Sequence, residues 1–126
     1  MRHALARGGA TPADVVCIVA HGTGTRLNDA AESAAILRVF ERSPAVTAPK
    51  SVVGHTLGAA GAFGVVTAAL VVERSTIPPT LNYDVPDPDC PIDVVAGAAR
   101  SADRGVTLVN AFGFGGQNAV LALAPA

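Results

Sequence analysis

The stretch that decides the fold reads Val15-Val16-Cys17-Ile18-Val19-Ala20 and continues as His21-Gly22-Thr23-Gly24-Thr25. A continuous apolar run that is rich in β-branched residues is typical of a strand buried on both faces. The glycine-bearing segment after it predicts a loop at the carboxyl end of that strand, where α/β sheets commonly bind ligands. His21 is therefore a candidate site residue. Taken alone, the segment is explained at least as well by an ordinary turn that carries a hydrogen-bonded histidine.

Working outward from this strand, the chain alternates helix-like and strand-like segments. The expected helices cover residues 3–8, 28–42 and 57–72, and the further expected strands cover 46–48, 92–96, 106–110 and 118–124. A proline-rich surface connection is expected between Ile77 and Pro91, because proline blocks both helices and central strands. This order predicts one α/β layered domain, mostly parallel at first and ending in a hairpin. A length of 126 residues fits a single domain.

The composition limits what the protein can do. Half of the residues are hydrophobic and 15% are charged, with a formal net charge of −1. A composition with so little charge is unusual for the surface of a small free-standing domain, so we expect that some faces meet a partner. The lack of a basic stripe argues against nucleic-acid binding. Cys17 and Cys90 lie far apart and lack metal-like spacing. We expect no metal or redox cofactor. No secretory signal is visible, and a reduced cytoplasmic setting is expected.

The apolar run from Leu57 to Val72 contains Gly58, Gly61 and Gly64. It is shorter than the roughly 20 residues that a membrane span requires. We therefore expect a helix buried at the centre of a layered domain, and no membrane partner.

A second candidate segment begins at Lys50 and reaches His55, just before the apolar helix. A buried lysine needs a partner, so Lys50 either reaches solvent or meets a carboxylate. An imidazole near a helix N-terminus is disfavoured as a cation, and a neutral His55 can donate an N–H to developing negative charge. Two polar residues in a surface loop remain an equally good explanation of this segment alone.

Asp29 and Glu32 begin the helix that follows the first loop. Their spacing predicts an N-cap with a capping box, which is sufficient to explain both residues. A carboxylate at this place could also pair with a nearby cation and orient it.

The third candidate segment runs from Asn110 to Asn118, between two apolar strands. Glycines let the backbone come close to a ligand, and a phenylalanine among them can act as a gate. The alternative is a wide hairpin whose aromatic side chains lie in the core.

Together and in this order, the segments resemble the β-ketoacyl-acyl carrier protein synthases of fatty-acid and polyketide synthesis. The resemblance rests on His21-Gly-Thr-Gly-Thr25, Asn28-Asp29-x-x-Glu32, Lys50-Ser-x-x-Gly-His55-x-x-Gly-Ala-Ala-Gly, Ile77-Pro-Pro-Thr-Leu-Asn82, Pro86-Asp-Pro-Asp-Cys90 and Gly113-Phe-Gly-Gly116. It covers essentially the whole chain. It implies the C-terminal half of a thiolase-like layered fold, with a mixed sheet and a buried helix.

The resemblance also implies the chemistry, which is decarboxylative condensation of an acyl thioester with a malonyl thioester. His21 and His55 would stabilise the enolate, and Lys50 would hold the electrostatics of the site with Glu32 as its partner and Asp29 in support. The gate would be formed by Phe112 and Phe114, and the substrate-binding loops by Thr23, Thr25, Gly113, Gly115 and Gly116. Implied partners are an acyl carrier protein, acyl and malonyl thioesters, and a second subunit, since family members are dimers.

The nucleophilic cysteine of the family belongs to its N-terminal half. Cys17 lies mid-strand and Cys90 in the proline-rich connection, so neither is expected to replace it. Ala111 and Gln117 stand where the family commonly has Ser and Thr. We therefore expect a chain that works with a cysteine-bearing N-terminal half. The alternatives are a non-catalytic subunit of the chain-length type and a truncated, inactive fragment.

Overall fold

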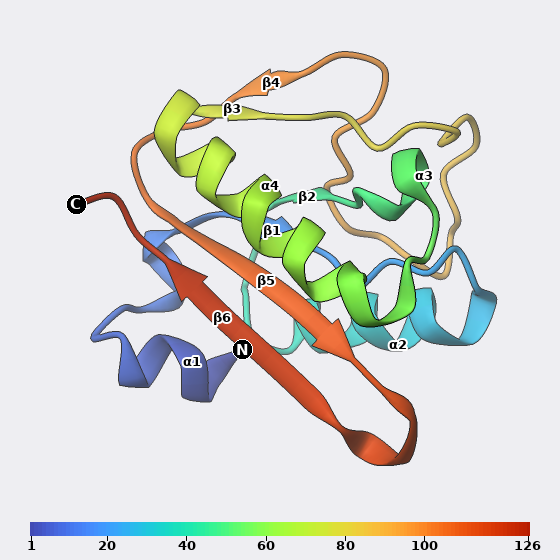
Figure 1. Ribbon diagram of the computed structural model, residues 1–126, viewed down its shortest axis with the longest axis horizontal. Coiled ribbons are helices and arrows are strands. Elements are labelled where there is room, and N and C mark those ends of the chain that lie inside the picture. Colours follow the sequence, from blue (N-terminus) through green and yellow to red (C-terminus); the bar gives the residue numbers. More distant parts are fainter.

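The computed structural model describes residues 1–126 (Figure 1). In chain order the elements are α1 (Arg2–Arg7), η1 (Pro12–Asp14), β1 (Val15–Val19), α2 (Arg26–Leu37), β2 (Ala45–Thr47), α3 (Lys50–Val53), η2 (Leu57–Ala59), α4 (Ala60–Arg74), β3 (Thr76–Ile77), β4 (Arg100–Ser101), β5 (Val106–Phe112), η3 (Phe114–Gly116) and β6 (Asn118–Leu123). The expected α/β order is confirmed, including the closing hairpin of β5 and β6.

The main sheet has the strand order β2-β1-β5-β6. β1 pairs in parallel with β2 and with β5, and β6 runs antiparallel to β5. Ile18 lies opposite Val46 and Leu108 in this register. Because β1 is central and covered on both faces, the continuous apolar run at 15–20 is explained.

The two faces of the sheet are covered by different helices. Ile18 and Leu108 belong to a buried cluster with Ile36 of α2 and Leu5 of α1. On the other face, Val19 and Val109 cluster with Ala68 of α4. The molecule thus has three layers, and Figure 1 shows α4 running along one face of the sheet.

Gly64 sets how closely α4 approaches the sheet. A Cβ atom at this position would lie 2.8 Å from Cγ1 of Val109. No L side chain fits there without a shift, so the glycine allows the backbone of α4 to approach strand β5 closely.

Several expected boundaries differ from the structure. Residues 92–96 form only isolated parallel bridges, one of them between Val46 and Val94, and no full strand. The second helix begins two residues earlier than expected, with Thr25 as its N-cap, and ends at Leu37. Lys50 is the first residue of the short helix α3, where a loop was expected. The small antiparallel pair of β3 and β4 was not expected at all.

The expectation that α4 is buried on all sides is wrong for this chain. Its buried residues are Gly64, Ala68 and Val71. Phe63, Val66 and Leu70 are 42%, 57% and 39% exposed, and they form the outer face of α4. By length and composition alone, the stretch Leu57–Arg74 would suffice to cross a membrane. In this fold, however, its inner side packs on a sheet.

Candidate active site

The carboxyl ends of three parallel strands meet at one edge of the sheet. His21 follows β1, Lys50 follows β2 as the start of α3, and Phe112 is the last residue of β5. His55 joins them from the turn between α3 and η2, and its ring centroid lies 5.6 Å from that of His21. The sequence-predicted histidines and lysine are therefore brought together at this edge.

The ring of His21 is held through its Nδ1 atom. The backbone N–H of Phe112 donates to Nδ1 at 3.3 Å, and Nζ of Lys50 lies 3.4 Å from the same atom. Lys50 also donates to the carbonyl oxygen of His21 at 2.5 Å. Because both neighbours of Nδ1 are donors, Nδ1 is the acceptor and the ring proton is assigned to Nε2.

His55 is oriented in the same way by a backbone amide. The N–H of Leu57 donates to Nδ1 of His55 at 3.2 Å. Leu57 itself adopts a left-handed conformation with φ of 50°, which is uncommon for a leucine. Both histidines thus keep an Nε2–H free to donate, and their rings stand nearly perpendicular at 87°.

The charges around His21 favour a neutral ring. Burial lowers the pKa of His21 first, and the neighbouring Lys50 ammonium and His55 lower it further, against a smaller opposing effect of Asp29. Burial also lowers the pKa of Lys50, while Glu32 and Asp29 act to raise it. A neutral imidazole donor beside an ammonium group suits the stabilisation of negative charge.

Glu32 does not form the expected capping box, because the N-cap is Thr25. Its carboxylate is buried and accepts hydrogen bonds from the backbone N–H groups of His21 and Gly22, both at 2.9 Å. Glu32 and Lys50 are not in direct ion-pair contact, since the ion pairs of the chain are Arg26–Asp89 and Arg100–Asp93, but the charge of Glu32 acts to raise the pKa of Lys50. Glu32 therefore fixes the backbone of the histidine loop.

Asn110 begins the third candidate segment, but the sequence analysis gave its side chain no role. It is 3% exposed, and its Nδ2 donates to Oε1 of Glu32 at 2.9 Å. The signal was present in the sequence as an amide at the end of the otherwise apolar strand segment Val106–Val109. The bridge to Glu32, 78 positions away, was not readable from it.

The two candidate gate residues are placed differently. The ring of Phe112 lies against His21, with centroids 5.7 Å apart. Phe114 is fully exposed, in a loop where Gly115 and Gly116 have φ of 73° and 79°. Within this chain the structure places Phe112 against His21 and leaves Phe114 exposed to solvent.

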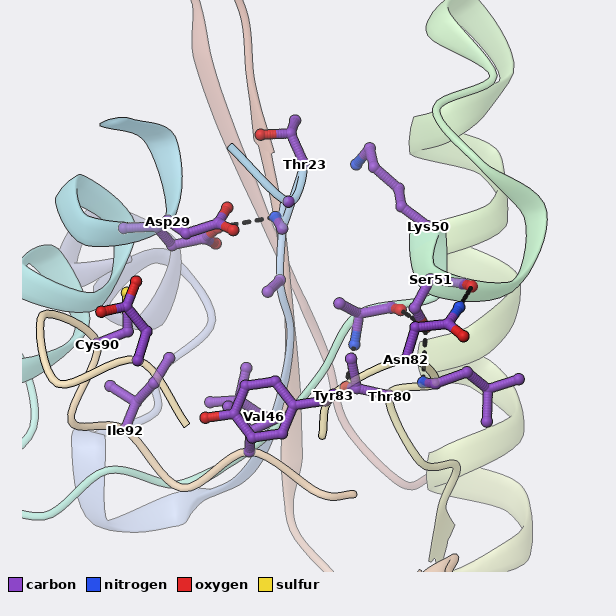
Figure 2. A pocket seen from close by; sticks show the side chains of 18 residues that line it. Thr23, Asp29, Val46, Lys50, Ser51, Thr80, Asn82, Tyr83, Cys90 and Ile92 are labelled. Atoms are coloured by element: carbon purple, nitrogen blue, oxygen red, sulfur yellow. Dashed lines mark hydrogen bonds between the residues drawn. The ribbon is translucent and has the colours of Figure 1, made fainter. Parts of the chain in front are cut away.

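Beside the histidine loop lies a cavity of about 310 Å³. Figure 2 shows Thr23 and Lys50 at one end and Tyr83 at the other. Asp29 and Glu32 also line it, whereas neither histidine does. The hydroxyl groups of Thr23 and Thr25 lie 2.8 Å apart on the same loop. The polar lining thus comes from the loop after β1, from α2 and α3, and from the proline-rich segment.

Neither cysteine lies where it could act on a ligand of the two histidines. Cys17 is fully buried in β1, and burial raises the pKa of its thiol to about 12. Cys90 lines the cavity, and burial followed by the charge of Asp87 raises its pKa as well. Both thiols are poor nucleophiles for this reason. No group of three or more His, Cys, Asp or Glu side chains is arranged to hold a metal ion.

The site thus consists of two oriented histidines and a lysine at the carboxyl ends of the parallel strands of an α/β domain. The family model described as "Beta-ketoacyl synthase, C-terminal domain" matches residues 1–84. The chain belongs to the β-ketoacyl synthase family, and it corresponds to the C-terminal part.

Named relatives agree with this assignment. Nodulation protein E of Rhizobium sp. (strain N33) is 45% identical over 97% of this chain and 31% of its own length. The 3-oxoacyl-[acyl-carrier-protein] synthase 2 of Mycobacterium leprae (strain TN) is 44% identical over 95% of this chain and 30% of its own length. The chain thus spans about a third of the curated relatives that it matches.

Solved structures superpose closely. The ishigamide ketosynthase/chain length factor matches with a TM-score of 0.95 and 44% identity, over 99% of this chain and 31% of that one. A type II polyketide synthase ketosynthase in complex with its acyl-carrier protein, AntDE:AntF, matches with a TM-score of 0.94 and 34% identity, again over 99% and 31%. The α/β fold with its mixed sheet is that of the ketosynthases.

Proposed function

We propose that this chain supplies the histidine side of an active site for decarboxylative condensation of an acyl thioester with a malonyl thioester. The observation that carries the proposal is the pairing of backbone donors with the Nδ1 atoms of His21 and His55. It leaves two Nε2–H donors in rings whose centroids are 5.6 Å apart. Two fixed donors that converge on one oxygen form an oxyanion hole.

The reaction assigns a task to each group. Loss of carbon dioxide from the malonyl thioester leaves its electron pair as an enolate, whose oxygen accepts the Nε2–H bonds of His21 and His55. The enolate carbon attacks the carbonyl of the acyl group, and the cysteine thiolate that carried this group leaves. Lys50 transfers no proton in this scheme; its ammonium adds positive potential and holds the loop through the carbonyl of His21.

The cysteine nucleophile comes from the N-terminal part of the family fold. The two cysteines of this chain are buried or poorly nucleophilic, as their raised pKa values show. The outer face of α4 is the surface that this N-terminal part would cover, since an exposed apolar face marks an interface. An acyl carrier protein is the proposed donor of both thioesters, in line with the complex of AntDE with AntF.

The test is a condensation assay on the chain co-expressed with a matching cysteine-bearing N-terminal half. We expect carbon–carbon bond formation by the assembled pair. His21→Ala and His55→Ala should each lower kcat by roughly 100- to 1,000-fold, the usual loss for one oxyanion donor. His3→Ala is the matched control, because His3 is exposed on α1.

Gel filtration must show that the halves assemble. An assembled pair without condensation would make the proposal wrong. If an assembled pair turns over and is unaffected by loss of either histidine, the chain instead acts as a non-catalytic subunit.

A further inference from the structure

We infer that Asn110 is a positioning residue, which fixes the donor orientation of His21 through Glu32 and ties the β5 strand to the histidine loop. The inference deepens the proposed function, and only its turnover measurement rests on that function. The argument starts from the hydrogen bond of 2.9 Å between Nδ2 of Asn110 and Oε1 of Glu32.

Three donors hold the carboxylate of Glu32 in one orientation. Oε1 accepts from the backbone N–H of His21 and from Asn110, and Oε2 accepts from the backbone N–H of Gly22. Without Asn110, the carboxylate keeps only the two amides of the loop that it is meant to hold. Asn110 is thus the contact that anchors this clamp to the sheet, since it lies on β5.

The same strand touches His21 a second time. Phe112, two residues after Asn110, donates its backbone N–H to Nδ1 of His21. The end of β5 is thus joined to His21 by two hydrogen-bonded links, one from the amide of Phe112 and one from Asn110 through Glu32. A shift of β5 at Asn110 therefore moves the amide that assigns the ring proton of His21 to Nε2.

The other end of the Asn110 side chain argues against a purely stabilising role. Its Oδ1 atom is buried and accepts no hydrogen bond within the chain. An apolar side chain of similar size would remove this unpaired acceptor, but it would also remove the donor that Nδ2 gives to the buried carboxylate of Glu32. The amide at this position is therefore best explained by what its Nδ2 group holds.

The test compares Asn110→Leu, Asn110→Asp and the control Asn118→Asp. Asn118 faces Phe112 across the hairpin on β6 and is exposed, so it offers the same chemical change away from Glu32. The first readout is the pair of imidazole ¹⁵N shifts of His21, which report the tautomer directly. The second is kcat and KM of the assembled protein.

We expect the wild type and Asn118→Asp to show His21 with its proton on Nε2 alone. Asn110→Leu should show a mixture of tautomers, and kcat should fall at least tenfold with little change in KM and in melting temperature. In Asn110→Asp, a protonated carboxyl can donate to Glu32 as the amide did. The fraction of His21 with its proton on Nε2 and the kcat should therefore be partly retained at low pH and decline as pH rises. A merely structural role of Asn110 does not produce this pH dependence.

Unchanged His21 shifts in a folded Asn110→Leu protein would overturn the inference. If Asn110→Leu does not fold, Asn110→Asp decides, and His21 shifts that stay at wild-type values at every pH would equally overturn it. Because the shifts need no turnover, a failure of the condensation assay leaves this result readable.

Discussion

The backbone N–H of Phe112 donates to Nδ1 of His21 at 3.3 Å, although the two residues lie 91 positions apart. The parallel pairing of β1 and β5 brings them together, because the two strands end at the same edge of the sheet. The same geometry leaves Nδ1 as an acceptor shared with Lys50, so the charge of Lys50 acts directly on the ring.

Lys50→Met should raise the pKa of His21. The ammonium of Lys50 lowers this pKa, second in size to burial, so its removal leaves burial as the main cause of the shift. The pKa of His21 should therefore move up but stay below its ordinary value. A titration of the His21 ring by NMR measures this, with Arg38→Met as the control for loss of one distant cation. A pKa that falls or does not move would contradict the contact.

The stability of the fold should decline below neutral pH, and His21 should account for part of that decline. The folded-state pKa of His21 lies below its ordinary value of 6.5. As pH falls through this value, the unfolded chain binds the proton first, so stability is lost until the folded-state pKa is passed.

Thermal melts between about pH 7 and pH 5, around the ordinary histidine pKa, should show this decline in the wild type. It should be smaller in His21→Asn. His3→Asn, which changes an exposed histidine, should keep the wild-type slope. Equal slopes in all three proteins would show that burial does not lower the pKa of His21.

Gly64→Ala should destabilise the protein by about 1–3 kcal/mol, the usual cost of overpacking. The new Cβ would lie 2.8 Å from Cγ1 of Val109. Gly61→Ala, on the same helix with no atom within 4 Å, is the control and should be neutral or stabilising by up to about 1 kcal/mol. Chemical denaturation measures both, and Val109→Ala should partly rescue Gly64→Ala.

The chain by itself should form oligomers or aggregate through the outer face of α4. Phe63→Ser combined with Leu70→Ser should shift its elution in gel filtration toward the monomer, because both side chains are exposed there. Val85→Ser, at a residue that is 82% exposed in the proline-rich segment, should not. A wild-type chain that elutes as a single monomer and melts cooperatively would argue against an interface on α4.

The layered order of the fold could be predicted because buried strands and apolar helices leave clear patterns. The apolar run at 15–20 predicts strand β1. Two apolar segments around a glycine-rich loop predict the closing hairpin. The hydrogen bonds that side chains make with residues far away in the sequence could not be predicted. Glu32 has the spacing of a capping box, yet its carboxylate binds the amides of the preceding loop.

The exposure of the outer face of α4 could not be predicted from the hydrophobic pattern either. The helix around Val66 is apolar on all sides, which indicates burial without saying by what, and in this chain only its inner side is covered. The convergence of His21, Lys50 and His55 followed from the family resemblance. The hydrogen bond of Asn110 to Glu32 could not be predicted from the sequence, because its partner lies on another element.

A main-chain amide donates to Nδ1 of each histidine and favours the ring proton on Nε2, and at His21 the ammonium of Lys50 is a second neighbour of Nδ1. The donors belong to positions 57 and 112, so the residues there can change without altering the protonation of either ring. Proline is the exception at both places, since it has no amide hydrogen. β-Branched residues are further disfavoured at position 57 by its left-handed backbone. The side chains at these two positions are thereby free to diverge while the two imidazoles keep one orientation.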